Sequence, residues 1–205
     1  RGSGNLLGAE QSGFIAEIGF EMYHKILDEA IQELKEDEFK GVFPDDKPRP
    51  FISFTQIDTD QEILIPDEYV TNISERYNLY TELSKLENET ELRAFEQQLH
   101  DRFGTVPPQV NDLLNTMRLQ WLGKAIGFEK ISLKSNVLRG YFITDQQSPY
   151  FETGAFRNVL SFVQANPRRT NLKEVKNTLR LSIESVNSID QAVVILSDIG
   201  EVAEI

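Results

Sequence analysis

The 205-residue sequence contains no cysteine, and this absence excludes disulfide bonds and every metal site built on thiolate ligands. It also has no apolar run that approaches the roughly 18 to 20 residues a helix needs to cross a bilayer, so we expect no membrane partner. Hydrophobic residues make up 40% of the chain and charged residues 26%, as in ordinary globular proteins. The chain is therefore long and apolar enough to bury a sizeable core.

Positive charge is scarce. Lysine and arginine total 21 against 33 aspartates and glutamates, which gives a formal net charge of −12. A surface of this sign repels a phosphate backbone, so the chain is a poor candidate for binding nucleic acid on its own. The charge favours protein partners, and the absence of cysteine fits a reducing cytoplasm.

The residue patterns of common enzymes are also missing. The only two histidines, His24 and His100, stand alone among charged helical residues, which is typical of solvated side chains rather than metal ligands or general bases. No lysine of a nucleotide-binding P-loop follows the glycines, and the acidic pair Asp58 and Asp60 lacks the rest of a calcium loop. We therefore expect no catalytic residue, no metal and no cofactor in this chain, and no enzymatic activity of its own.

A glycine-rich segment, residues 1–13 (RGSGNLLGAEQSG), opens the sequence. Glycine accepts backbone angles that other residues avoid, so the segment is typical of a shaped loop that presents Arg1 and Gln11. Because no strand or helix precedes the loop, we expect it to be part of a larger protein whose C-terminal part follows. Apolar residues at steps of three and four then predict a long helix over residues 14–35.

A segment with three prolines, residues 41–50 (GVFPDDKPRP), reads as a linker and places a domain boundary. We predict one domain over residues 1–45, which carries the loop and the long helix, and a second over residues 46–205. In the second, the patterns predict a strand at 51–57, an extended piece at 63–66, and helices near 73–86, 89–103, 107–126, 153–165 and 188–202. A hairpin over 130–143 turning at Ser135 and Asn136, and a strand at 178–184 paired with 172–176, complete the set.

Because strands and helices come in blocks, the fold class is α+β. We expect a small mixed or antiparallel sheet with several packed helices, preceded by the long N-terminal helix. One basic cluster stands out from the acidic background; it consists of Arg168, Arg169, Lys173, Lys176 and Arg180. Most charge runs are simply solvated edges. The alternative is a docking patch for an acidic protein surface or a phosphate.

Residues 1–13, together with 18–23 (IGFEMY), resemble the end of the motor of the bacterial transcription-repair coupling factors, a family that shares this loop with the RecG branch-migration helicases. Residues 64–70 (LIPDEYV), 75–80 (ERYNLY) and 101–110 (DRFGTVPPQV) resemble the C-terminal domain of the coupling factors, which RecG lacks. The resemblance is specific up to about residue 128. One departure is Ser3, where the family usually has alanine; both are small, so the loop shape should be kept.

The resemblance implies a parent that is an ATP- and magnesium-dependent double-stranded DNA translocase of helicase superfamily 2, a hydrolase of ATP that displaces stalled RNA polymerase and recruits the repair protein UvrA. It implies that the loop couples ATP hydrolysis to movement on DNA. The coupling positions are Arg1 and Gln11, held by Gly2, Gly4, Gly8 and Gly13. It further implies that residues 46–205 form a non-catalytic regulatory domain, which docks on the N-terminal UvrA-binding module of the same protein and masks it.

Overall fold

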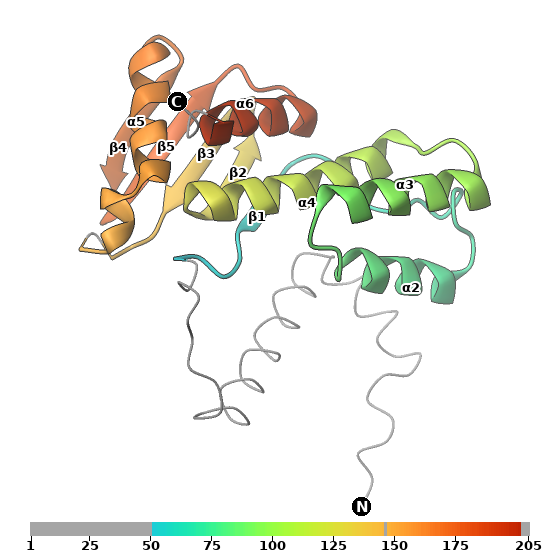
Figure 1. Ribbon diagram of the computed structural model, residues 1–205. Helices are drawn as coiled ribbons and strands as arrows, with labels where there is room; N and C mark the ends of the chain where they lie inside the picture. Colours follow the sequence, from blue (N-terminus) through green and yellow to red (C-terminus); the bar gives the residue numbers. More distant parts are fainter. Residues whose placement is uncertain (1–50, 146, 202–205) are drawn as a thin grey trace, which may run out of the picture. The chain divides into compact units, whose positions relative to one another are not determined.

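A five-stranded mixed sheet forms the centre of the larger of two compact units in the computed structural model, which describes residues 51–145 and 147–201 (Figure 1). Its strands are β1 (Gln56–Thr59), β2 (Phe128–Lys134), β3 (Val137–Phe142), β4 (Thr170–Val175) and β5 (Thr178–Glu184), in the spatial order β1-β2-β3-β5-β4. β1 runs parallel to β2, and all other neighbours are antiparallel.

Two tight turns fix the register of the antiparallel strands. Ser135 and Asn136 join β2 to β3 with φ of 52° and 58°, and Lys176 and Asn177 join β4 to β5 with φ of 51° and 66°. Two successive residues at positive φ are the mark of the hairpin turn whose twist matches that of the strands. The sequence-predicted turn at Ser135 and Asn136 is confirmed.

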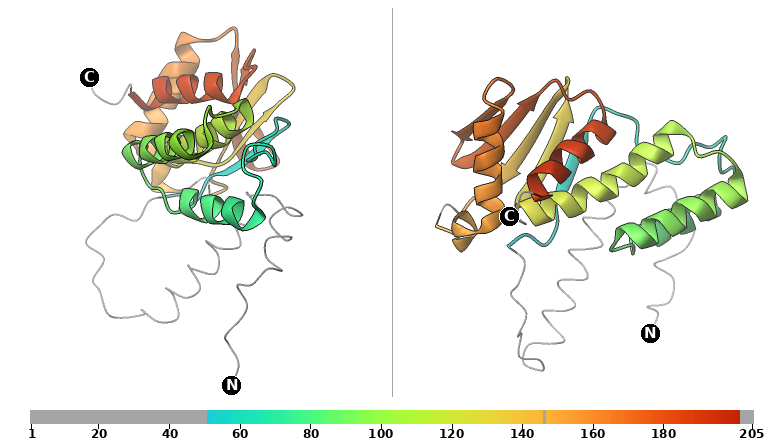
Figure 2. Two further views of the ribbon diagram at one scale, coloured as in Figure 1. Left: turned by 90° about the vertical axis from the view of Figure 1, so that its right-hand side faces the viewer. Right: turned by 45° about the horizontal axis from the view of Figure 1, so that its top comes forward.

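Three helices cover one face of this sheet. Residues 112–126 of α4 (Pro108–Ile126), α5 (Gly154–Ala165) and α6 (Ile189–Glu201) contribute apolar side chains to a common core with the inward residues of the strands (Figure 2). A short 3-10 helix, Pro149–Glu152, precedes α5 and places Tyr150 in that core. No helix among the described residues of this unit covers the opposite face (Figure 2).

The other unit, described here over residues 64–111, is helical. It contains α2 (Ile73–Leu83), α3 (Glu89–Phe103) and the first turn of α4. Asn72 and Asn88 cap α2 and α3; each side-chain oxygen accepts from the backbone N–H three residues on, at 3.0 Å, which satisfies an amide the helix cannot pair. α3 ends at Gly104, whose φ is 86°.

The α+β class with a mixed sheet and packed helices is confirmed over the described residues. The predicted strand at 51–57 is largely wrong, because the ladder begins only at Gln56, and the extended piece at 63–66 forms no strand. The N-terminal helix and the boundary between residues 45 and 46 lie outside the described residues.

Candidate functional site: a basic pocket on the open face of the sheet

A bend between α5 and β4 brings the basic cluster next to the sheet. α5 ends at Asn166, whose carbonyl accepts from the N–H groups of Arg169 (3.3 Å) and Thr170 (3.1 Å). The backbone of Arg169 then extends the β4–β5 ladder, since its carbonyl accepts from the Glu184 N–H at 2.8 Å. In return, the Arg169 guanidinium donates to the Glu184 carbonyl at 3.3 Å. The bend is therefore fixed at both ends.

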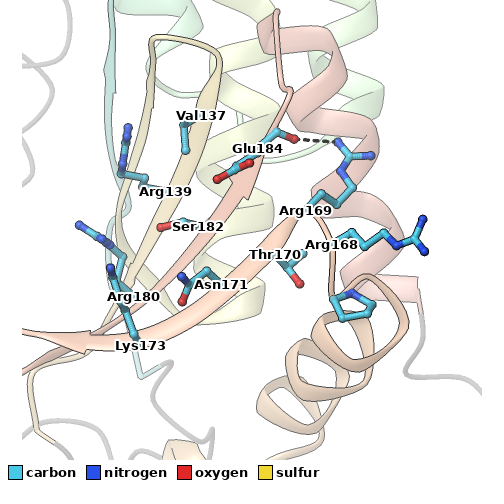
Figure 3. A pocket seen from close by; sticks show the side chains of 11 residues that line it. Val137, Arg139, Arg168, Arg169, Thr170, Asn171, Lys173, Arg180, Ser182 and Glu184 are labelled. Carbon is cyan, nitrogen blue, oxygen red and sulfur yellow. Dashed lines mark hydrogen bonds between the residues drawn. The ribbon is translucent and has the colours of Figure 1, made fainter.

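A pocket of about 410 Å³ opens here, on the sheet face opposite α5 and α6 (Figure 3). Four of the five predicted patch residues line it, and the structure therefore brings them together: Arg168, Arg169, Lys173 and Arg180. The fifth, Lys176, lies in the β4–β5 turn and is not part of the lining. The remaining lining residues are Val137, Arg139, Pro167, Thr170, Asn171, Ser182 and Glu184.

Arg139 is a pocket residue that sequence reasoning missed. It stands in β3 opposite Ser182 of β5, about forty positions away along the chain. Its neighbours on either side, Leu138 and Gly140, are buried, so Arg139 points to the outer face. The alternation of side chains along a strand is the signal that could have placed it there. The sequence did not indicate that β3 pairs with β5, so nothing linked Arg139 to the cluster.

Cations gather on one side of the pocket. Figure 3 shows Arg139, Arg180 and Lys173 along that side, while Arg169 reaches toward Glu184 and Arg168 points outward. Lys173 and Arg180 are direct cross-strand partners in the β4–β5 ladder. Like charges placed directly opposite each other destabilise a sheet. Among the described residues, none of these five side chains forms an ion pair with a carboxylate, and Glu184 is the only acidic residue in the lining.

Arg180 has a further unusual feature. Its Nε atom is buried and has no hydrogen-bond partner within the described part of the chain. A buried donor without an acceptor costs free energy, of the order of 1–3 kcal/mol.

The same sheet face neutralises its other cations. Lys130 and Lys134 of β2 both contact the carboxylate of Asp58 in β1, at 3.2 Å and 2.5 Å. Burial raises the pKa of Asp58, but hydrogen bonds from Lys134 and Lys130 outweigh that effect and hold it below its usual value. Positive charge is thus compensated near β1 and uncompensated near β3, β5 and β4.

The other sequence predictions concern residues outside this pocket. Arg1, Gln11, Gly2, Gly4, Gly8 and Gly13 lie outside the described residues. Across residues 51–145 and 147–201, no group of three or more histidine, aspartate or glutamate side chains could hold a metal ion, and no helix is long and apolar enough to span a membrane. His100 is exposed, and its Nδ1 lies 3.7 Å from the carboxylate of its neighbour Asp101.

The residues 64–70 and 101–110 hold the helical unit together. The Tyr69 hydroxyl contacts the carbonyls of Leu99 (3.1 Å) and Gly104 (3.2 Å), and its ring packs edge-on against Phe103 at 5.7 Å. The N–H of Ile65 donates to the Tyr80 hydroxyl at 2.8 Å. These conspicuous side chains therefore have structural contacts that explain their presence.

Comparison with known proteins gives consistent matches. The model of the TRCF domain family matches residues 59–153. Transcription-repair-coupling factors from Rickettsia prowazekii, Haemophilus influenzae and Escherichia coli are 32%, 33% and 30% identical over 84%, 70% and 64% of this chain. The chain spans only 14%, 13% and 11% of the lengths of those three relatives.

A solved structure supports the fold. The crystal structure of a C-terminal domain of transcription-repair coupling factor matches 73% of this chain and 91% of its own length, with a TM-score of 0.57 at 17% identity. At this identity the match shows a shared fold and no more. Nine of the eleven pocket residues lie beyond residue 153, outside the segment that the family model matches.

Proposed function

This chain belongs to the transcription-repair-coupling factor family through the TRCF domain at residues 59–153, and we propose that it is the regulatory C-terminal part of such a factor. The domain performs no chemistry itself. It docks on the N-terminal module of the same protein that binds UvrA, and masks that module until RNA polymerase is engaged. The full-length factor is a cytoplasmic, ATP- and magnesium-dependent translocase on double-stranded DNA.

The TRCF match carries this proposal, and the structure is compatible with it. An intramolecular lock must be releasable, and interfaces of that kind are modest in area and fairly polar. The outer sheet face, with Asp58, Lys130 and Arg139 half-exposed, is a polar surface of that character.

Calorimetry on two separate pieces tests the masking role. The chain is titrated into the N-terminal UvrA-binding module of the same full-length protein, and UvrA is then offered to the mixture. We expect measurable heat and weaker capture of UvrA. An absence of binding heat at high micromolar concentration would contradict the masking role.

The non-catalytic status has a separate test. The purified chain is incubated with ATP and magnesium, with and without DNA, and the released phosphate is measured. We expect none above background. ATP hydrolysis by the purified chain would contradict the non-catalytic role and would favour an enzyme that acts on nucleotides.

The coupling role of Arg1 and Gln11 is a proposal for the full-length factor. An arginine and an amide on a glycine-shaped loop can bond to motor elements whose geometry changes with the bound nucleotide. Arg1→Ala or Gln11→Ala should leave ATP hydrolysis largely intact and abolish displacement of stalled polymerase. Variants that displace polymerase at the normal rate would contradict this role.

Nucleic-acid docking through the basic pocket is a second candidate function. The uncompensated cations of β3, β4 and β5 favour it, and the net charge of −12 works against it. Its signature would be DNA binding that weakens steeply with salt and is lost when Arg168 and Arg169 are changed to alanine.

A further inference from the structure

We propose that the basic pocket between β3, β5 and the α5–β4 bend binds one phosphate group, either inorganic phosphate or the terminal group of a phosphate monoester. The proposal does not rest on the masking function. It would give the domain a small-anion ligand.

Uncompensated positive charge is the first argument. Lys173 and Arg180 face each other across the β4–β5 ladder, and Arg139 of β3 lies on the same face, opposite Ser182, two residues further along β5 than Arg180. The chain has 33 acidic residues that could neutralise these cations, in the way that the Asp58 carboxylate neutralises Lys130 and Lys134. An anion between the strands would turn a repulsive cross-strand pair into two attractive contacts.

The donors are the second argument. The Arg180 Nε–H is buried without an acceptor, and a guanidinium presents its N–H groups in a fork that matches two oxygens of a phosphate. Asn171 and Ser182, opposite each other in β4 and β5, add an amide and a hydroxyl to the lining. The bend that supplies Arg169 is fixed by backbone hydrogen bonds at both ends, so the pocket is formed before a ligand arrives.

Size and charge select the ligand. At about 410 Å³ the pocket is at the small end of ligand sites, large enough for a phosphate and a modest attached group. A long polyanion such as DNA would extend over many residues and be repelled by the net charge of −12. A small anion interacts only with the nearest side chains, because salt screens charges that lie more than about 8 Å away at physiological ionic strength. A phosphate monoester carries about 1.5 to 2 negative charges and three acceptor oxygens. A single carboxylate has less charge and fewer oxygens, so a phosphate is the better partner for the three cations on this side of the pocket. Glu184 opposes binding, and its carboxylate limits the affinity.

The test is a titration of the whole chain with inorganic phosphate, with phenyl phosphate, and with a short DNA duplex, at constant ionic strength. Binding is followed by calorimetry and by thermal unfolding. Arg180→Gln and Lys173→Gln are the pocket variants. Lys124→Gln is the control, because Lys124 is exposed in α4 of the same unit and outside the pocket.

We expect phosphate or phenyl phosphate to bind and to raise the unfolding temperature. Arg180→Gln should weaken binding about tenfold or more, since a charge-assisted hydrogen bond is lost. Lys124→Gln should match the parent chain. Without phosphate, Lys173→Gln should unfold at the same or a higher temperature, because it removes the repulsion with Arg180. Preference for phenyl phosphate over inorganic phosphate would identify an ester as the ligand.

Three results would overturn the proposal. One is the absence of any phosphate effect at millimolar concentration. Another is equal affinity in the pocket variants and in Lys124→Gln. The third is binding of the duplex alone, which would assign the pocket to nucleic acid. If Arg180→Gln fails to fold, Lys173→Gln carries the test, because Lys173 is exposed on the edge strand β4.

Discussion

The ring of Tyr150 fills the space that a β-carbon at position 127 would occupy. Gly127 ends α4 with φ of 102°, and the Tyr150 hydroxyl donates to the carbonyl of the residue just before it, Ile126. Tyr150 is only 2% exposed and touches the rings of Phe142, Phe151 and Phe156. The end of α4 and the 3-10 helix are thus fixed to each other by one glycine and one tyrosine.

Gly127→Ala should destabilise the protein. An alanine there meets both a strained backbone angle and the Tyr150 ring, so we expect a loss of about 2–4 kcal/mol in the free energy of unfolding. Urea unfolding measures it. Gly200→Ala is the control: Gly200 lies in α6 with no atom near its missing β-carbon, and alanine should raise stability by about 0.5–1 kcal/mol. Equal effects at the two positions would contradict the role of Tyr150.

The Tyr150 hydroxyl should make the protein sensitive to alkali. Burial raises the pKa of Tyr150 above its ordinary value of 10.0. Above pH 10 the unfolded chain therefore releases a proton that the folded chain retains, and stability falls as pH rises. Tyr150→Phe should lower stability at pH 7 by about 1–3 kcal/mol, because the Ile126 carbonyl loses its donor.

The measurement compares how stability changes with pH in the unmodified protein and in Tyr150→Phe. Burial also raises the pKa of Tyr69 and Tyr80, so both proteins should lose stability in alkali. The decline between pH 9 and the alkaline limit should be shallower for Tyr150→Phe, as measured by urea unfolding across pH. Parallel declines would mean that the Tyr150 hydroxyl is not buried in solution.

Local signals predicted most of the fold. Asn72 and Asn88 mark the starts of α2 and α3 because their side chains bond to the backbone only three residues away, and Asn136 and Asn177 tolerate the positive φ of the hairpin turns. Such preferences depend on neighbours in sequence. A single sequence contains enough information to place them.

Long-range pairing was not predictable in the same way. Residues 51–57 alternate like a strand, yet Thr55 is held by a hydrogen bond from its hydroxyl to the Phe128 carbonyl, 73 residues away, and the ladder begins after it. The pocket is the same case. Arg168 to Arg180 are adjacent in sequence and were found, whereas Arg139 joins them only through the pairing of β3 with β5.

Removing the cap of α2 should loosen that helix. Asn72→Ala leaves the Glu75 N–H without its acceptor and should cost about 1 kcal/mol. Asn78→Ala, in the exposed middle of α2, is the matched control and should be neutral or slightly stabilising, since alanine is the better helix former. Hydrogen exchange of the α2 amides is the measurement. Faster exchange in Asn72→Ala but not in Asn78→Ala is expected, and equal exchange would argue against the cap.

Asp58 should protect the sheet against acid. Because its folded pKa lies below the ordinary aspartate pKa of 3.8, its contribution to stability is present above that pH and is lost as pH falls through the folded value. Asp58→Asn should therefore be less stable than the unmodified protein at pH 7, by a small amount because the side chain is partly exposed. The difference in stability should shrink below about pH 4. High salt should shrink it as well, since salt screens the contacts with Lys130 and Lys134. Glu62→Gln, an exposed acidic position in the same unit, serves as the control for loss of one negative charge. A difference between Asp58→Asn and the parent that is independent of both pH and salt would show that the two lysines do not stabilise the sheet through this carboxylate.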